Sequence, residues 1–185
     1  FYRLEYENGK INIYDRQLFR MEFEKSSENI HGWRLKALAS RHSSFVANRV
    51  ELTYQKKSDR LERIMEPYGN QINVIYDKDG RIIQLVSPTN AVAYSYDSIG
   101  NLCNVKSASA ALSLSQASHV EIRYGYELVN GKMLLNSRII NNAEAWYSVN
   151  YDQTGRVISI GDKSKEIDCT WRFSREDNSL TVIPP

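Results

Sequence analysis

The sequence of 185 residues has few cysteines, few prolines and no long apolar run. Its two cysteines, Cys103 and Cys169, lack both the CxxC spacing of metal or redox sites and the density of a disulfide scaffold, so we expect buried free thiols. No apolar stretch is long enough to cross ~30 Å of hydrocarbon as a helix, and no charged and then apolar leader opens the chain. The sequence therefore predicts no membrane span and carries no visible secretion signal.

An excess of charge of one sign is also missing. The chain has 24 basic and 22 acidic side chains, and no Lys/Arg block is longer than two residues, so we expect no nucleic-acid partner. No Gly-rich phosphate loop occurs, which argues against a nucleotide cofactor. His31, His42 and His119 lie far apart without ligand-spaced neighbours, so we expect no metal site and no cofactor.

Aromatic residues are abundant, with twelve Tyr, five Phe and three Trp against only four Pro. This balance favours pleated strands over helices. Hydrophobic residues make up 42% of the chain, which is enough for a core, so we expect one folded unit.

A repeated motif organises the chain, and it reads Tyr-Asp-x-x-Gly-(Arg/Asn)-aliphatic. Clear copies occupy residues 76–82, 96–102 and 151–157. Weaker copies begin at Tyr126, which has one extra turn residue, and at Phe173, where Asn178 replaces Gly; Tyr54 to Leu61 and Tyr6 to Ile11 are further variants. The spacing is too loose for a strict solenoid but typical of stacked hairpins. The motif residues are Tyr76, Asp77, Gly80, Arg81, Tyr96, Asp97, Gly100, Tyr126, Gly131, Tyr151, Asp152, Gly155 and Arg156.

The motif has a physical explanation as a turn. An Asp that opens a type I turn accepts a hydrogen bond from the backbone N–H two residues on, forming an Asx turn. The Gly takes a positive φ without a Cβ clash and closes the turn through a G1 bulge. Asp77 with Gly80 illustrates both roles.

The segments that flank each turn alternate as strands do. Ile72, Val74 and Tyr76 share one face, while the return strand carries Ile82 and Leu85 three residues apart, which indicates a local bulge or a two-sided strand. We expect the repeat tyrosines to form hydrophobic ladders between neighbouring hairpins.

The fold class we predict is all-β, with tandem antiparallel hairpins forming a curved, twisted sheet. Residues 50–185 form the hairpin array, and residues 1–49 form an irregular, repeat-like region in which 33–38 is either a short helix or a strand. Residues 107–118 are small and polar, which predicts a surface loop.

Residues 76–82, 96–102 and 151–157 resemble the motif of the RHS/YD-repeat superfamily. In that superfamily, long hairpin arrays wind into a hollow β-shell around a toxic or signalling domain, as in polymorphic toxins, insecticidal toxin complexes and teneurins. The resemblance implies a secreted or cell-surface protein whose partners are further repeats of a longer parent chain or an enclosed toxin or effector domain. The Asp-Pro-x-Gly autoproteolysis motif of many bacterial members is absent, so self-cleavage is not carried over.

About seven hairpins make a curved sheet and not a closed vessel, so a longer parent or an oligomer is implied. The chain opens with Phe1 and stops at Pro185 just after a strand-like run, which also suggests a piece of a longer protein. The function we predict is a non-enzymatic scaffold that encloses or presents a toxin or effector domain.

Other functions are open at this point. An aromatic sheet face could bind carbohydrate or a protein, and open edges could complete another protein's sheet by strand addition. Catalysis has little support, because Asp77 and Asp79 are explained by their turn, and Ser43 and Ser44 beside His42 lack a nucleophile elbow.

Overall fold

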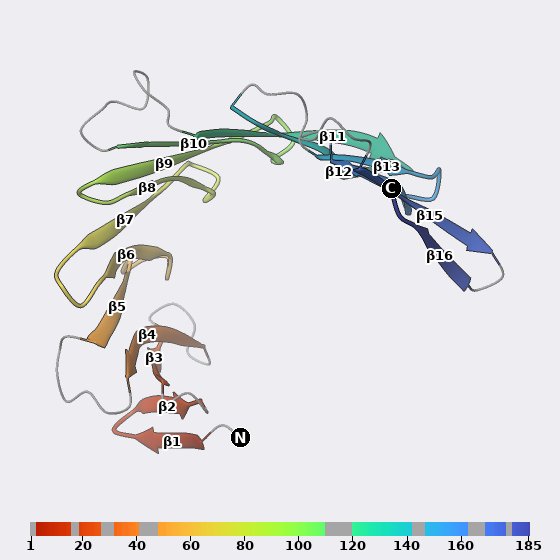
Figure 1. The fold of residues 1–185 in the computed structure, drawn as a ribbon. Coiled ribbons are helices and arrows are strands. Elements are labelled where there is room, and N and C mark those ends of the chain that lie inside the picture. Colours follow the sequence, from red (N-terminus) through yellow and green to blue (C-terminus); the bar gives the residue numbers. More distant parts are fainter. Residues whose placement is uncertain are drawn as a thin grey trace. The chain divides into compact units, whose positions relative to one another are not determined.

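The computed structural model describes residues 3–15, 19–26, 32–40, 48–109, 120–141, 147–162, 169–176 and 179–185. Within these ranges every regular element is a strand (Figure 1). The described residues contain no helix that is long and apolar enough to cross a membrane. The strands are β1 (Arg3–Glu7), β2 (Lys10–Tyr14), β3 (Phe19–Lys25), β4 (Trp33–Ser40), β5 (Arg49–Tyr54), β6 (Leu61–Met65), β7 (Gln71–Tyr76), β8 (Ile82–Val86), β9 (Asn90–Tyr96), β10 (Leu102–Ser109), β11 (Val120–Val129), β12 (Lys132–Ile140), β13 (Tyr147–Tyr151), β14 (Val157–Asp162), β15 (Cys169–Glu176) and β16 (Ser179–Ile183).

The chain divides into two compact units, Phe1–Ala91 and Val92–Pro185. In the first unit β1 to β8 pair antiparallel, each with the strand before and after it in sequence. In the second unit β10 to β16 pair in the same way. The strand order follows the sequence, which confirms the predicted all-β class of tandem antiparallel hairpins.

Among the described strand pairs, five hairpins have a register shift, and in each of these the shift falls beside an aromatic residue. The aromatic residues are Phe23, Tyr54, Tyr76, Tyr126 and Tyr151. Such a shift inserts one extra residue into one strand and bends it. The predicted bulge is therefore confirmed.

The hairpin of β7 and β8 explains the unusual aliphatic spacing. Tyr76 pairs with Ile82 and Val74 pairs with Leu85, which leaves Ile83 as the extra residue. Ile82 and Leu85 consequently lie on the same face although they are three residues apart, because the bulge resets the alternation.

Each unit has one apolar and one polar face, because residues directly opposite in an antiparallel ladder share a face. In the first unit an apolar row crosses β2 to β5 through Ile13, Met21, Leu38 and Val50. The adjacent row on the other face is Asn12, Glu22, Ala37 and Glu51.

The second unit repeats this division. Val149, Ile160 and Trp171 face each other across β13 to β15, and their neighbours Ser148, Gly161 and Thr170 form a row on the opposite face. In these rows the two faces of each unit thus differ in polarity.

The core is thin. The buried apolar residues in the described part are Ala37, Ala39, Val74, Ala91 and Ala108, and no large side chain there is fully buried. Large side chains on the apolar faces remain open instead, with exposed fractions of 65% for Leu4 and 69% for Leu128. A single layer of sheet leaves such side chains without a second layer to pack on.

Two predictions need correction or refinement. Residues 107–109 belong to β10 and Ala108 is 3% exposed, so this part of the predicted surface loop is strand; its remainder lies outside the described residues. The hydrogen-bonded ladder between β10 and β11 extends to residue 107, which pairs with Val120. Cys103 and Cys169 are free, but half-buried instead of buried, since no second layer covers them.

In the N-terminal region, residues 33–40 are strand β4 and not a helix. Strands β1 to β4 pair in the same way as the later hairpins. The predicted boundary between residues 49 and 50 stays a prediction. His31, His42, His119, Ser43, Ser44 and Asn178 lie outside the described residues.

Candidate functional site: aspartate turns and tyrosine clamps

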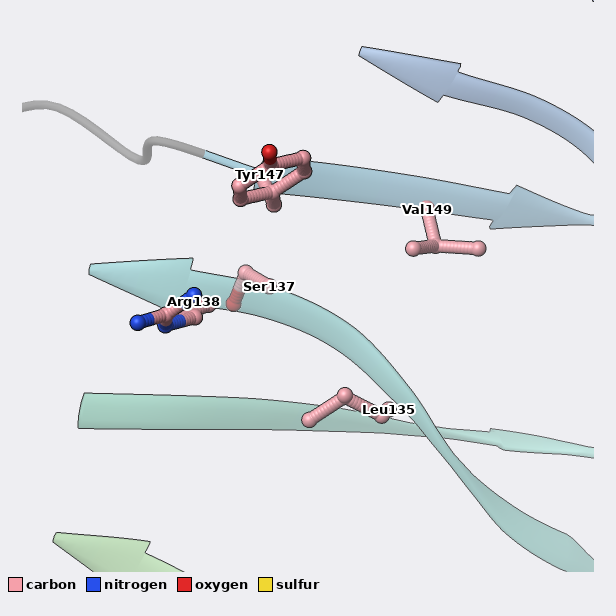
Figure 2. A pocket seen from close by; sticks show the side chains of 5 residues that line it. All are labelled: Leu135, Ser137, Arg138, Tyr147 and Val149. Carbon is pink, nitrogen blue, oxygen red and sulfur yellow. The ribbon is translucent and has the colours of Figure 1, made fainter. Parts of the chain in front are cut away.

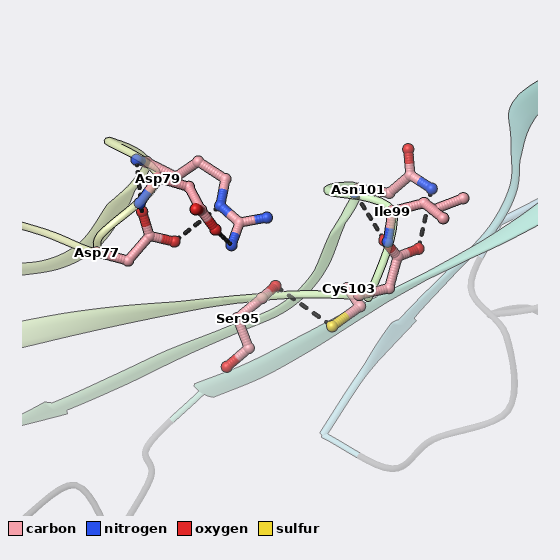
Figure 3. A network of polar contacts seen from close by, with 8 residues as sticks. Asp77, Asp79, Ser95, Ile99, Asn101 and Cys103 are labelled. Atoms are coloured by element: carbon pink, nitrogen blue, oxygen red, sulfur yellow. Dashed lines mark hydrogen bonds and ion pairs between the residues drawn. The ribbon is translucent and has the colours of Figure 1, made fainter.

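The turn that starts at Asp77 is held by hydrogen bonds to one carboxylate oxygen (Figure 3). The backbone N–H groups of Asp79 and Arg81 both donate to Oδ1 of Asp77 at 2.9 Å. The N–H of Gly80 donates to the carbonyl of Asp77 at 3.1 Å, and the N–H of Asp77 donates to the carbonyl of Arg81 at 2.9 Å. Gly80 has φ 84°, a conformation that strains any residue with a Cβ.

The turn at Asp97 has the same construction. Ile99 and Asn101 donate their backbone N–H groups to Oδ1 of Asp97 at 3.0 and 2.8 Å. The Nδ2 group of Asn101 also donates to Oδ2 of Asp97 at 2.9 Å, just as Nε of Arg81 donates to Oδ2 of Asp77 at 2.8 Å. The side chain of the Arg or Asn that follows the motif Gly therefore donates a hydrogen bond to the second carboxylate oxygen. The sequence analysis did not predict this role.

The third turn, at Asp152, replaces this side-chain donor with another. The backbone N–H groups of Thr154 and Arg156 donate to Oδ1 of Asp152 at 2.8 and 3.0 Å, and the Thr154 hydroxyl donates to the same atom at 2.6 Å. Gly155 closes the turn with φ 84°. Three turns of the chain thus fix an Asp carboxylate with local donors alone.

The donors keep the turn carboxylates ionised. Desolvation raises the pKa of Asp77 and Asp97, but the hydrogen bonds from Arg81 and Asn101 outweigh it, so both pKa values lie below their ordinary range. The Thr154 hydroxyl and the Arg156 N–H lower the pKa of Asp152. Carboxylates held in this way accept hydrogen bonds and are poor proton donors near neutral pH.

Tyrosine hydroxyls connect one hairpin to the next. Each of four repeat tyrosines donates to a backbone carbonyl of the preceding hairpin, an arrangement that we call the tyrosine clamp. The clamps join Tyr54 to Leu35 at 2.5 Å, Tyr76 to Leu61 at 2.8 Å, Tyr126 to Leu102 at 2.8 Å and Tyr151 to Leu135 at 2.6 Å.

The clamps bridge places where the backbone ladder between hairpins has ended. The ladder of β6 and β7 ends at the pair Arg63 and Asn73. Leu61 lies two residues beyond this pair and Tyr76 three residues beyond it, so the hydroxyl reaches a carbonyl that the ladder leaves open. The other three clamps have the same offsets from their ladder ends.

The side chains of the clamp tyrosines are partly shielded from water. Burial raises the pKa of Tyr54, Tyr76, Tyr126 and Tyr151. Arg34 lies 4.7 Å from the ring centroid of Tyr54, and Arg60 lies 5.5 Å from that of Tyr76. The predicted hydrophobic ladders between these tyrosines stay a prediction. The hydroxyl contact was not foreseen, because the acceptor is a main-chain atom of another hairpin.

The motif positions that remain are Tyr96 and those of the weaker copies. Tyr96 is half-buried at the end of β9. Asn130 and Gly131 have φ values of 48° and 75°, which make a two-residue hairpin loop of type I′ and not the Asp turn. In the Tyr54 copy, Asp59 with φ 49° takes the place of Gly.

The C-terminal copy carries no tyrosine at the position that the clamps of the other repeats occupy. The ladder of β14 and β15 ends at Ser159 and Arg172. With the offsets of the other clamps, the clamp position in β15 is Arg175 and the acceptor position in β14 is Val157. Because Arg175 has no hydroxyl, it cannot form a tyrosine clamp with β14.

The polar face of the first unit holds a paired charge cluster. Glu22, which is 8% exposed, accepts from Arg20 at 2.6 Å and Arg49 at 2.5 Å. Desolvation raises the pKa of Glu22, but Arg49 and Arg20 outweigh it and hold the pKa below its ordinary value. Within the described ranges no group of His, Cys, Asp and Glu side chains could hold a metal ion.

Open grooves lie on the apolar faces. In the first unit a groove of about 640 Å³ is lined mainly by β3, β4 and β5, with Phe19, Met21 and Val50 among its walls. In the second unit a groove of about 290 Å³ lies between β12 and β13 (Figure 2). Leu135, Ser137 and Arg138 line it from one strand and Tyr147 and Val149 from the other.

No family model matches the chain. No curated protein matches it. Among solved structures, that of TcdB2-TccC3-Cdc42 is 11% identical over 93% of this chain and 12% of that chain, with a TM-score of 0.34. A porin-like protein from Bacteroides uniformis is 10% identical over 98% of this chain and 92% of that chain, with a TM-score of 0.35.

The Photorhabdus luminescens Tc holotoxin pore is 12% identical over 95% of this chain and 12% of that chain, with a TM-score of 0.34. The chain thus spans 12% of the length of the matched chain in the TcdB2-TccC3-Cdc42 structure and in the Tc holotoxin pore. At these TM-scores the three likenesses carry no argument about what this chain does.

Proposed function

We propose that this chain is a non-enzymatic β-repeat scaffold, a segment of a secreted or surface protein of the RHS type that encloses or presents a toxin or effector domain. The observation that carries the proposal is the uncovered apolar face. Leu4 and Tyr6 in the first unit are each 65% exposed, and Trp171 in the second is 46% exposed. Burial of apolar surface lowers the free energy by about 25 cal/mol per Å², so covering a face of this kind is favourable.

The repeats themselves support a structural role. Asp turns and tyrosine clamps direct their polar atoms to the backbone of the chain, so these motif residues are occupied with holding hairpins together. The charge cluster around Glu22 is likewise paired internally. These residues are better suited to fixing a sheet than to binding substrate.

A binding module is the second candidate, and Tyr147 and Trp171 are the residues that favour it. They are 42% and 46% exposed on the apolar face of the second unit and could stack on a sugar ring or a partner's side chain. The clamp tyrosines do not join such a row, because each is half-buried and its hydroxyl is bound.

Hydroxyl-radical footprinting of the full-length product of the parent reading frame tests the proposal. We expect Met21 and Trp171, on the apolar faces, to be protected in the parent protein and reactive in the 185-residue segment. Exposed Tyr68 in a turn provides the control, because it should react equally in both.

Equal reactivity of Trp171 in parent and segment would contradict enclosure. Quenching of Trp171 fluorescence by an oligosaccharide would then favour the binding module. A parent frame without further Tyr-Asp-x-x-Gly units would also count against the scaffold.

A further inference from the structure

The groove between β12 and β13 contains a cation in apolar surroundings. Arg138 stands between Tyr124 and Tyr147 in register, and the register places it on the same face as Leu135 and Val149. These four neighbours offer rings and aliphatic carbons on the face of the sheet that carries Arg138. Figure 2 shows Arg138 with the other residues that line the groove. A charged group in such surroundings is costly unless it finds a counter-charge.

The described residues do not supply that counter-charge. Nε of Arg138 is buried and has no hydrogen-bond partner among them, and Arg138 takes part in none of their ion pairs. Asp162 shares the face but is the register partner of Tyr147, two strands away from Arg138, at a backbone separation of ~10 Å.

The unpartnered Nε alone would not define a site. Arg63 also has a buried Nε without a partner among the described residues, yet it pairs in register with Asn73 on the polar face and lines neither of the two grooves. Arg138 differs because it lines a groove of about 290 Å³ together with Leu135 and Val149.

We propose that this groove binds a carboxylate carried next to an aliphatic group, and that its occupant is an acidic side chain within an apolar stretch of polypeptide that covers this face. The proposal rests on the proposed function for the existence of such a covering polypeptide. Arg138 would pair with the carboxylate, while Leu135 and Val149 would contact the neighbouring aliphatic side chain.

The chemistry favours a carboxylate over other anions. The planar guanidinium forms paired hydrogen bonds with a carboxylate, and such charge-assisted bonds are about twice as strong as neutral ones. A phosphate dianion would bring two negative charges against the single charge of Arg138, so one of them would stay uncompensated beside the apolar walls. The single cation therefore matches a single negative charge with an apolar neighbour.

The test is a titration of the 15N-labelled 185-residue chain with two capped tripeptides, acetyl-Leu-Glu-Leu-amide and acetyl-Leu-Gln-Leu-amide, followed on the Nε–Hε resonance of Arg138. We expect saturable shifts and an affinity about tenfold higher for the Glu peptide, as a charge-assisted hydrogen bond provides. Arg138→Met should abolish the preference for Glu. Arg63→Met is the matched control and should leave the preference unchanged.

Equal binding of the Glu and Gln peptides, absence of binding, or an unchanged preference in Arg138→Met would each overturn the proposal. Hexanoate is the second probe. If it binds as tightly as the Glu peptide, a small molecule and not a polypeptide is the occupant, which overturns the assignment of the partner. Footprinting of the parent protein remains independent, because the face can be covered without an acidic side chain at Arg138.

Discussion

The hydroxyl of Tyr76 donates a hydrogen bond of 2.8 Å to the carbonyl of Leu61, fifteen residues earlier in the chain. Leu61 lies in the return strand of the preceding hairpin, at a point where the backbone ladder between β6 and β7 has already ended. A side-chain hydrogen bond thus connects the two strands where their main-chain hydrogen bonds have ended. Four repeats share this arrangement, which makes it the structural signature of the chain.

Tyr76→Phe should lower the free energy of unfolding by about 0.5–1.5 kcal/mol, the net value of one hydrogen bond. The ring is kept, so the loss isolates the hydroxyl. Tyr68→Phe is the control, because Tyr68 is 84% exposed, and it should change stability little. Urea denaturation measures both, and equal midpoints for the two variants would contradict the clamp.

Arg175→Tyr should add a clamp between β14 and β15, since Arg175 lies three residues beyond the ladder end at Arg172. We expect a gain of about 0.5–1 kcal/mol if the new hydroxyl reaches the Val157 carbonyl. Arg175→Phe supplies the same ring without the donor. Thermal melts that rank the two variants equally would show that no clamp forms.

Gly155→Val should destabilise strongly, by about 1–3 kcal/mol, because a β-branched residue is forced to positive φ. Gly155 has φ 84°, and an added Cβ would also lie 3.3 Å from Cδ1 of Leu134. Gly155→Asn should cost less, since Asn tolerates left-handed backbone. If the melting temperature of the Val variant matched that of the unsubstituted 185-residue chain, the turn assignment would be wrong.

Stability should fall as the pH rises beyond the ordinary tyrosine pKa of about 10. Burial raises the pKa of the four clamp tyrosines in the folded chain, so the folded state holds protons that the unfolded state releases. Their contribution is complete below the unfolded pKa and is lost as the pH rises through the folded values. Denaturation midpoints between pH 8 and 11.5 measure this, and Tyr76→Phe should reduce the slope.

Stability should also fall in acid, through the turn carboxylates. The folded pKa of Asp97 is lowered, so its contribution is present above the unfolded value of about 3.9 and is lost as the pH falls through the folded value. Asp97→Asn keeps an acceptor oxygen without the titration. Its unfolding free energy should depend less on pH between 5 and 2, and an unchanged dependence would contradict the role of Asp97.

Much of the fold was predictable because its signals are local. Strands were evident from alternation such as Ile72, Val74 and Tyr76, and the bulge from the spacing of Ile82 and Leu85. The role of Arg81 and Asn101 as side-chain donors was accessible in principle, since the motif permits only Arg or Asn there. The groove around Arg138 was not, because it depends on which residues of β12 and β13 come into register.

The sequence by itself determined the turns, because every donor to Asp77, Asp97 and Asp152 lies within four residues of its acceptor. Local spacing fixes such contacts before any tertiary structure forms. Tertiary structure alone decided the clamps, whose partners are separated by 15 to 24 residues. Their acceptors depend on where each ladder ends, and only the assembled sheet sets that point, just as only the assembled sheet reveals which apolar side chains remain without a covering layer.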